Sequence, residues 1–269
     1  MYTKENLKQA LCQMGLKDTD CVMVHASMKA IGEVEGRGDT VIDAFMEYLK
    51  EGLFMMPTHT WAQMKANYPL YDPETEPGCV GILPEIFRKR TGVVRSLHPT
   101  HSMAVYGTGS KWGMSAEKYI RGEENCTTPC PPGGCWDRLR TVNAKILMIG
   151  CTHIKNTFIH SVEECFDVPE RLSEKPLELQ IKMPDGTVRD VAVRHHHNVV
   201  TPFISGNFDK LRQAFYDTGA AVDVKFGDAD CILCEARKVY EVTGRILQKE
   251  INCLVDRETL PAEWWQTEQ

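Results

Sequence analysis

The sequence has no long apolar run and no long basic run, and each absence excludes a class of protein. No segment approaches the roughly 20 apolar residues that a membrane-spanning helix needs. The first six residues are polar and lack the apolar centre of a signal peptide. Lysine and arginine number 31 against 37 aspartate and glutamate residues, and they form no basic stretch that would suit phosphates. We therefore expect a cytoplasmic protein that binds neither membrane nor nucleic acid.

Standard nucleotide-binding fingerprints and paired zinc ligands are also missing. The glycines match neither the P-loop nor the dinucleotide pattern. Cys231 and Cys234 are spaced like half of a zinc site, but no second pair follows and their segment is typical of a buried strand. The eleven cysteines are therefore expected to be reduced thiols, and no metal is expected. The loop that holds Cys126, Cys130 and Cys135 leaves a cysteine-based metal site open as an alternative.

Helical and extended patterns alternate along the first 150 residues. They predict helices over residues 4–14, from the cap Asp39 through Lys50, and over 82–90, with strands over 21–25, 53–56, 93–95 and 145–150. Later segments predict a hairpin turning at Asp185-Gly186, a helix over 207–218, strands near 222 and 231, and a helix over 235–250. We predict one domain over 1–269 of the α/β class: a layered sheet with flanking helices in 1–175 and a smaller β-rich C-terminal lobe in 176–269 that is not independent.

A histidine and a carboxylate three residues apart follow the apolar segment 145–150. If this stretch is helical, His160 and Glu163 share one face of the helix. The carboxylate can then orient the imidazole and raise its basicity, which suits a general base. The pair is expected near the carboxyl end of a strand, where open α/β sheets bind their ligands. A surface pair without catalytic function is the alternative.

Three more polar segments lie at the ends of predicted strands. Segment 25–32 combines a histidine, a serine and a lysine before a glycine-rich loop that can bind an anion or simply cap a helix. Segment 56–61 carries threonines and a histidine that can line a cleft or cap a helix. Segment 95–107 has two histidines around a proline, and small residues that permit close approach of a ligand. Histidines 195–197 are interpreted as a solvated strand, because neighbouring strand side chains alternate faces.

Taken together, these segments resemble the aminoglycoside N3-acetyltransferase family in order and spacing across nearly the whole chain. The resemblance is carried by His-Ala-Ser-Met at 25–28, Met-Pro-Thr at 56–58, Arg-Ser-Leu-His-Pro at 95–99 with Ser102 and Gly107, Asn156-Thr157 with His160 and Glu163, and Gly-Asp-Ala-Asp-Cys at 227–231. It implies an α/β fold distinct from the common GNAT acetyltransferases. It also implies transfer of an acetyl group from acetyl-CoA to the 3-amino group of an aminoglycoside.

The resemblance further implies roles for individual residues. His160 is expected to be the general base and Glu163 its orienting partner. Thr58 and Thr60 are expected at the substrate, and either of their hydroxyls, that of Ser27 or backbone N–H groups can stabilise the oxyanion. Glu164 and Asp167 are expected to attract a polycationic acceptor, although helical spacing places Glu164 beside the face of Glu163.

Coenzyme A is expected along the loops after the first strands. Ser27, Lys29 and Ile31 are expected near its pantetheine or pyrophosphate, and Arg95, His98 and Ser102 are expected to complete that wall. His98 can equally hold the turn at Pro99 by bonding backbone atoms. The expected partners are acetyl-CoA and a small amine, and the protein is expected to be a monomer or homodimer.

Two segments depart from the family pattern near the expected acceptor side. Gly-Cys-Thr-His at 150–153 replaces a Gly-Val-Gly type of loop, and the segment 127–136 departs from the usual Ser-Pro-Leu element. These changes leave two alternatives open for the chain: acyl transfer to a different small amine, and an inactive homologue with a cysteine-based metal site.

Overall fold

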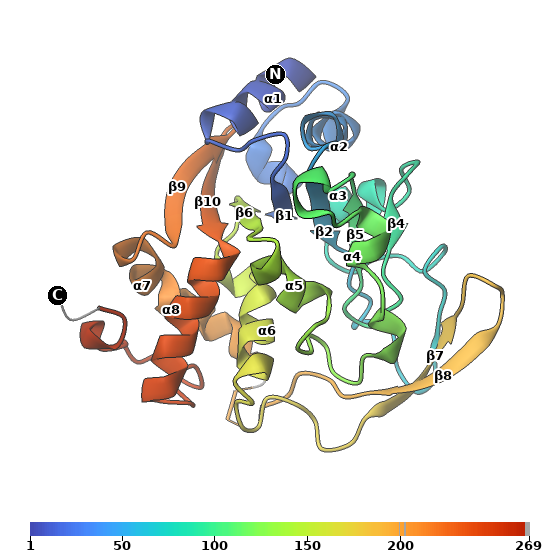
Figure 1. Cartoon of the computed structure of the whole chain (residues 1–269), viewed down its shortest axis with the longest axis vertical. Coiled ribbons are helices and arrows are strands. Elements are labelled where there is room, and N and C mark those ends of the chain that lie inside the picture. The colour runs from blue at the N-terminus through green and yellow to red at the C-terminus, as the bar shows by residue number, and fades with distance from the viewer. Residues whose placement is uncertain (199, 202, 267–269) are drawn as a thin grey trace.

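A computed structural model describes residues 1–198, 200–201 and 203–266. A seven-stranded sheet in the order β4-β5-β2-β1-β6-β10-β9 forms the centre of the molecule (Figure 1). Its strands are β1 (Cys21–Ala26), β2 (Leu53–Pro57), β4 (Val94–Arg95), β5 (Met103–Tyr106), β6 (Lys145–Ile149), β9 (Ala221–Phe226) and β10 (Ala229–Glu235). The helices are α1 (Lys4–Gln13), α2 (Arg37–Tyr48), α3 (Ile82–Phe87), α4 (Ala116–Tyr119), α5 (Cys135–Thr141), α6 (Phe158–Cys165), α7 (Arg212–Asp217) and α8 (Ala236–Lys249).

The three central strands β2, β1 and β6 run parallel, whereas the outer strands of the sheet are antiparallel to their neighbours. Residues pair as Met23↔Met55 between β1 and β2, and as Ala26↔Ile149 between β1 and β6. The carboxyl ends of all three parallel strands therefore lie at one edge of the sheet. The start of β5 joins them there, because Pro57 pairs with Met103.

Helices cover both faces of the sheet, which explains why the central strands are apolar on both sides. In β1, Val22 and Val24 pack into the core with α1, α2 and α3, while Met23 packs into the opposite core with α5, α6 and α8. Period-two alternation along the strand thus supplies two separate cores. The result is the three-layer arrangement that places strand ends, rather than strand faces, next to solvent.

A tight turn at Gly150 sends the chain from β6 toward α6. Gly150 has φ +61°, and a Cβ atom built there would lie 2.1 Å from the Cβ of Ala30. Only glycine fits both the left-handed backbone and this close approach. The turn brings the loop before α6 against the loop that follows β1.

Residues after 176 are divided between two sheets. Strands β7 (Leu177–Lys182) and β8 (Val188–Val193) form a hairpin that joins β3 (Leu70–Tyr71) in a separate three-stranded sheet, away from the main sheet in Figure 1. Strands β9 and β10 instead extend the main sheet, and α8 packs against α5 and α6. This part of the chain therefore contributes to the main α/β layer as well as to a smaller β structure.

The predicted α/β fold with a large sheet and flanking helices is confirmed. The predicted cap at Asp39 is wrong: α2 begins at Arg37 with Gly36 as its N-cap, and Asp39 lies in the first turn. The predicted helix over 207–218 is divided into a 3-10 segment, Ile204–Leu211, and α7. Within the described residues, no helix combines the length and apolar character that crossing a bilayer requires.

Candidate active site

A cavity of about 780 Å³ opens at the edge where the parallel strands end. Its wall combines strand-end residues, the loop before α6 and two segments that follow β8. The lining residues include Val24, His25, Ala26 and Ser27 from β1 and its end, Pro57, His59, Trp61, Met64 and Lys65 after β2, His101 before β5, Gly150 to Thr157 except Thr152 and His153, His160, Leu177, His195, His196, Phe203, Ile204 and Ser205. The cavity therefore lies at the position that open α/β sheets use for ligands.

His160 faces this cavity from α6 and is held by a buried carboxylate. Its Nδ1 lies 2.9 Å from Oε2 of Glu163, which is the pairing expected from their spacing along the helix. The other oxygen of Glu163 accepts a hydrogen bond of 2.6 Å from Nε of Arg171. Because Nδ1 faces the carboxylate, the tautomer with the proton on Nδ1 is favoured, and the lone pair of Nε2 is left without a partner among the described residues.

The charge of Glu163 is maintained by its partners in a buried position. Glu163 is 1% exposed and Arg171 is 3% exposed. Burial alone would raise the pKa of the Glu163 carboxyl, but the hydrogen bond from His160 and the adjacent Arg171 guanidinium hold that pKa below its usual range. Glu163 is therefore an ionised, fixed acceptor for the His160 ring.

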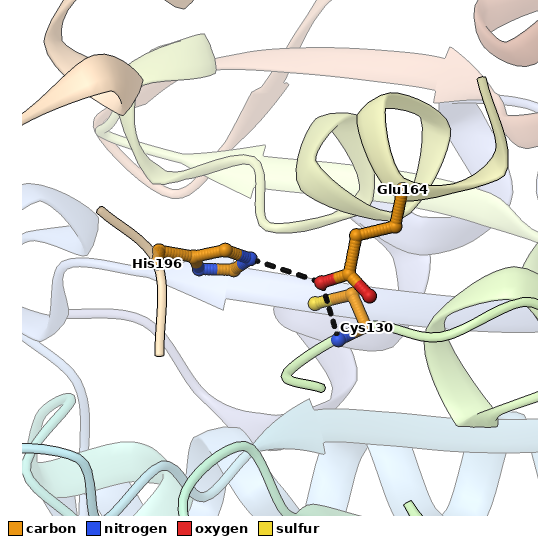
Figure 2. Close-up of side chains that lie close together, drawn as sticks. All are labelled: Cys130, Glu164 and His196. Atoms are coloured by element: carbon orange, nitrogen blue, oxygen red, sulfur yellow. Dashed lines mark hydrogen bonds and ion pairs between the residues drawn. The ribbon is translucent and has the colours of Figure 1, made fainter. Parts of the chain in front are cut away.

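A second histidine–carboxylate pair lies next to the first. His196 reaches the cavity from the chain after β8, and its Nε2 lies 3.2 Å from Oε1 of Glu164, the residue after Glu163 (Figure 2). The His196 and His160 rings stack with centroids 3.9 Å apart and planes 22° apart. His196 is thus part of the cavity wall, so the interpretation of 195–197 as a solvated strand is wrong for its central residue.

Glu164 is held by the protein on both oxygens. Oε2 accepts a hydrogen bond of 2.6 Å from Oγ1 of Thr128, and Oε1 accepts one of 2.9 Å from the backbone N–H of Cys130. The Sγ atom of Cys130 completes a group with Glu164 and His196 whose ligand atoms lie within 4.8 Å of one another (Figure 2). Figure 2 shows the carboxylate of Glu164 between the imidazole and the cysteine, so its first partners are hydrogen-bond donors of the protein.

The cysteine loop does not gather its three thiols at one point. Cys126 Sγ donates to Oε1 of Glu123, whereas Cys135 Sγ donates to the carbonyl of Tyr119. Only Cys130 belongs to the group of possible ligands found among the described residues. All eleven cysteines are free thiols, as expected.

Four other histidines of the wall, His25, His59, His101 and His196, have lowered pKa values. Burial lowers the pKa of His25 to about 4, and it holds the pKa values of His59 and His101 well below the usual range. Burial and the neighbouring His160 likewise lower the pKa of His196 to about 4, against the effect of Glu164. Rings of His59, His101 and His196 follow one another with centroids 4.7 and 5.1 Å apart. These four histidine rings of the wall are therefore neutral near neutral pH.

The residues expected at coenzyme A are placed in three different environments. Ser27 lines the cavity. Lys29 is exposed on the 3-10 turn after β1 and does not line the cavity. Ile31 is fully buried in the core with α1 and α2, because its turn folds back on the sheet. The Ile31 side chain is therefore not positioned to contact a cofactor in the cavity.

Arg95 and Ser102 bind the protein rather than the cavity. The Nη2 of Arg95 donates to the carbonyl of Thr58 over 2.7 Å, its Nη1 donates to the carbonyls of Pro73 and Glu76, and its Nε lies 3.1 Å from Oγ1 of Thr58 and 3.2 Å from Oγ of Ser102. Every nitrogen of the guanidinium is thus occupied. Arg95 fixes the loops after β2 and before β5, and this explains its absence from the cavity wall.

Three more expected site residues are also used in internal hydrogen bonds. Oγ1 of Thr58 lies 2.9 Å from Oγ of Ser102, and Oγ1 of Thr60 donates to the carbonyl of Pro99 over 2.6 Å. His98 is 0% exposed, and its Nδ1 accepts the backbone N–H of His101 over 3.0 Å. For His98 the turn-holding alternative therefore describes the structure. None of these side chains lines the cavity.

The two acids expected to attract a polycation do not line the cavity either. Oε2 of Glu164 bonds Thr128, and its Oε1 bonds Cys130 and His196, as described above. Asp167 is exposed beyond the end of α6, with φ +49°. Its exposed carboxylate is not part of the cavity wall.

Other residues of the wall were missed from the sequence. Lys65 and Phe203 lie in irregular segments without a periodic pattern, so nothing local pointed to them. Lys155 lies one residue before the Asn156-Thr157 motif, so it could have been identified from the sequence as a neighbour of that motif. Asn156 also lines the cavity, and its Oδ1 has no hydrogen-bond partner among the described residues.

The fold and this cavity define an α/β protein with a buried histidine–carboxylate site at the carboxyl edge of its parallel strands. The chain belongs to the aminoglycoside 3-N-acetyltransferase family, whose model matches residues 23–248. Aminoglycoside N(3)-acetyltransferase VII of Streptomyces paromomycinus is 30% identical over 185 residues, which cover 62% of this chain and 62% of that protein. Aminoglycoside N(3)-acetyltransferase III of a Salmonella species is 25% identical over 93% of this chain and 92% of its own length.

Solved structures of similar fold agree with this assignment. The crystal structure of aminoglycoside acetyltransferase AAC(3)-Xa superposes with a TM-score of 0.79 at 23% identity, over 96% of this chain and 95% of that one. The binary complex of AAC-IIIb with CoASH superposes with a TM-score of 0.78 at 21% identity, over 92% of this chain and 97% of that one. At these identities the likeness concerns the fold.

Proposed function

We propose that this chain transfers an acetyl group from acetyl-CoA directly to an amine, with His160 as the general base. Family membership supports the reaction class. The observation that carries the proposal for the base is the ordered set Arg171–Glu163–His160, in which a buried carboxylate fixes the ring of a histidine that faces the cavity. Glu163 is proposed as the residue that orients the ring and stabilises its protonated form.

His160 has a defined task in such a reaction. An acceptor amine is mostly protonated near neutral pH, so it must first lose a proton to solvent. The neutral nitrogen then attacks the thioester carbonyl carbon while Nε2 of His160 takes one of its remaining N–H protons. The C–N bond forms and the C–S bond breaks when the tetrahedral intermediate collapses. The leaving thiolate then takes the proton from Nε2, which returns the imidazole to its neutral form. Glu163 remains ionised throughout, because Arg171 stays bound to it.

Ser27 is the proposed side-chain donor for the oxyanion. Of the three hydroxyls expected for this role, those of Thr58 and Thr60 are bonded inside the protein and lie off the cavity wall. Ser27 lines the cavity and its hydroxyl makes no hydrogen bond to another described residue. A donor fixed near the reacting carbonyl contributes by stabilising charge that develops only in the transition state.

The cavity fits acetyl-CoA as the acetyl donor. Lys65 and Lys155 give its wall two positive charges, which suit phosphate groups, and the amide oxygen of Asn156 is free to accept an N–H. A protein of the same fold has been solved with CoASH bound. The 3-amino group of an aminoglycoside is the acceptor named by the family and is the reference acceptor for an assay.

The test is release of the CoA thiol, followed with a thiol reagent, from acetyl-CoA in the presence of sisomicin or gentamicin and of simple amines. Wild-type protein is expected to release thiol with at least one acceptor, and His160→Ala is expected to reduce kcat by roughly 10²- to 10⁴-fold. Asp167→Asn is the matched control, because this exposed carboxylate lies on the same segment but off the cavity. Unchanged turnover in the His160 variant would falsify the proposed mechanism.

A further inference from the structure

The wall of the cavity contains no carboxylate among the described residues. Six of its members are histidines with an unpaired or partly paired ring, two are lysines, and the others are glycine or residues with apolar, hydroxylic, thiol or amide side chains. The two carboxylates closest to it in sequence, Glu163 and Glu164, are both bonded to protein donors on each oxygen. Neither carboxylate lines the cavity, so neither is placed to receive the ammonium group of a ligand there.

The fixed charges on the wall are positive. Lys65 and Lys155 are exposed lining residues, and neither forms an ion pair with a described residue. An aminoglycoside carries several ammonium groups, and each one that leaves water needs a negative partner or hydrogen-bond acceptors in its place. A wall without acids therefore offers a polycation no counter-charge, whereas its two lysines accept the phosphates of acetyl-CoA.

Large apolar side chains surround the opening of the cavity. Trp61 is 52% exposed, Ile154 is 39% exposed and Phe203 is 78% exposed, and all three line it. Deeper in the wall, Met64, which is 1% exposed, continues this apolar surface. Exposed aromatic side chains around a concave site favour a ligand with an apolar body, because binding removes their surface from water.

We propose that the acceptor is a small monoamine with an aromatic or aliphatic body and not a polycationic aminosugar. The inference rests on the proposed acetyl transfer and names the acceptor class for that same site. The reaction is unchanged: the single amino group attacks the thioester carbonyl, His160 takes its proton and CoA leaves as the thiol. Specificity comes from Trp61, Ile154 and Phe203, which contact the body of the acceptor.

The first experiment compares kcat/KM for 2-phenylethylamine and for sisomicin at saturating acetyl-CoA. The wild-type protein is expected to favour 2-phenylethylamine by about tenfold or more, a difference comparable to one unfavourable charge contact. Equal or greater kcat/KM for sisomicin overturns the inference and leaves the proposed transferase standing. Absence of thiol release with every acceptor overturns both.

The second experiment places a carboxylate at the opening. Ile154→Glu is expected to raise kcat/KM for sisomicin and lower that for 2-phenylethylamine, each by about fivefold or more, because it adds the missing counter-charge. Val222→Glu makes the same kind of change at an exposed position of β9 that does not line the cavity, and it is expected to leave both values within about twofold. Equal effects of the two variants would contradict a specificity set by the wall.

Trp61→Ala separates a contact with the acceptor from a contact with the donor. It is expected to raise KM for 2-phenylethylamine about tenfold while the KM for acetyl-CoA changes less than twofold. Val222→Ala serves as the matched truncation of an exposed apolar side chain. A rise confined to the KM for acetyl-CoA would assign Trp61 to the donor and overturn its role in acceptor choice.

Discussion

Two histidine–carboxylate pairs meet on α6, and they differ in how each carboxylate is balanced. Glu163 binds His160 from its own helix and is neutralised by the guanidinium of Arg171. Glu164 binds His196 from a distant segment and is balanced only by neutral donors of Thr128 and Cys130. Consecutive residues of one helix thus serve two rings that stack on each other.

The difference suggests a division of tasks between the rings. The low pKa of His196, caused by burial and by His160, keeps that ring neutral when its neighbour takes a proton. A neutral ring stacked at 3.9 Å supports the His160 ring without competing for its proton. The proposed base is therefore oriented from one edge by Glu163 and packed on one face by His196.

The largest expected effect is the difference in kcat between variants of the two histidines. His160→Ala should lower kcat by roughly 10²- to 10⁴-fold because it removes the proton acceptor, whereas His196→Ala should cost about tenfold because it removes the stacked ring and its contact with Glu164 but not the base. Steady-state thiol release with the best acceptor measures both. Equal losses in the two variants would mean that the pairs do not differ as proposed.

The next effect concerns stability. Arg171→Ala should lower the free energy of unfolding by about 3–5 kcal/mol, because it leaves the buried charge of Glu163 without its partner. Thr128→Val removes a neutral donor from Glu164 and should cost about 1–3 kcal/mol. Urea unfolding followed by fluorescence gives both values. A greater loss for the Thr128 variant would reverse the comparison.

Acid pH should destabilise the fold through its buried histidines. Burial lowers the pKa of His25, His153 and His196 to about 4 in the native chain. Between about pH 6.5 and 4 the unfolded chain binds protons that the native chain excludes, so each such histidine removes up to about 1.4 kcal/mol of stability per pH unit of acidification.

This pH dependence can be assigned to residues by substitution. His196→Gln and His153→Gln should each reduce the loss of unfolding free energy below pH 6.5 by the contribution of one histidine. Urea unfolding midpoints from pH 7 to pH 4.5 measure this loss. The two variants should behave alike although only His196 belongs to the site. An unaltered slope in His196→Gln would show that its ring is not the neutral partner described.

The last comparison concerns the carboxylates themselves. Glu163→Gln should lower kcat by about 10- to 100-fold, because the amide can place its N–H on Nδ1 of His160 and shift the proton to Nε2. Glu164→Gln should lower kcat by less than about threefold, because its partner is not the base. Thiol-release kinetics over pH 6–9 distinguish them. A greater loss for Glu164→Gln would make His196 the base.

Local patterns allowed part of this site to be predicted. The His160–Glu163 hydrogen bond follows from a spacing of three on a helix, and the position at a strand end follows from the apolar segment before it. His196 and Arg171 could not be found in this way, because their contacts join segments that no periodicity relates. Arg95 was expected at coenzyme A from the family resemblance, but the fold uses all its donors to join loops.

Segments after residue 176 show the same limit for the fold. Their strands were predicted from alternation and from the Asp-Gly turn, but the pattern does not say which sheet a strand joins. β9 and β10 reach the main sheet because β10 pairs with β6, and this long-range contact has no local signature.

The position of Arg95 has a consequence for how this protein can diversify. Its guanidinium ties together the backbone after β2, the loop near Pro73 and the hydroxyl of Ser102, so the inner rim of the cavity is a single braced unit. Trp61, Ile154 and Phe203 lie outside that brace, exposed and free of such bonds. Substitutions that alter which amine is accepted can therefore accumulate at these three positions without disturbing the frame that holds the chemistry.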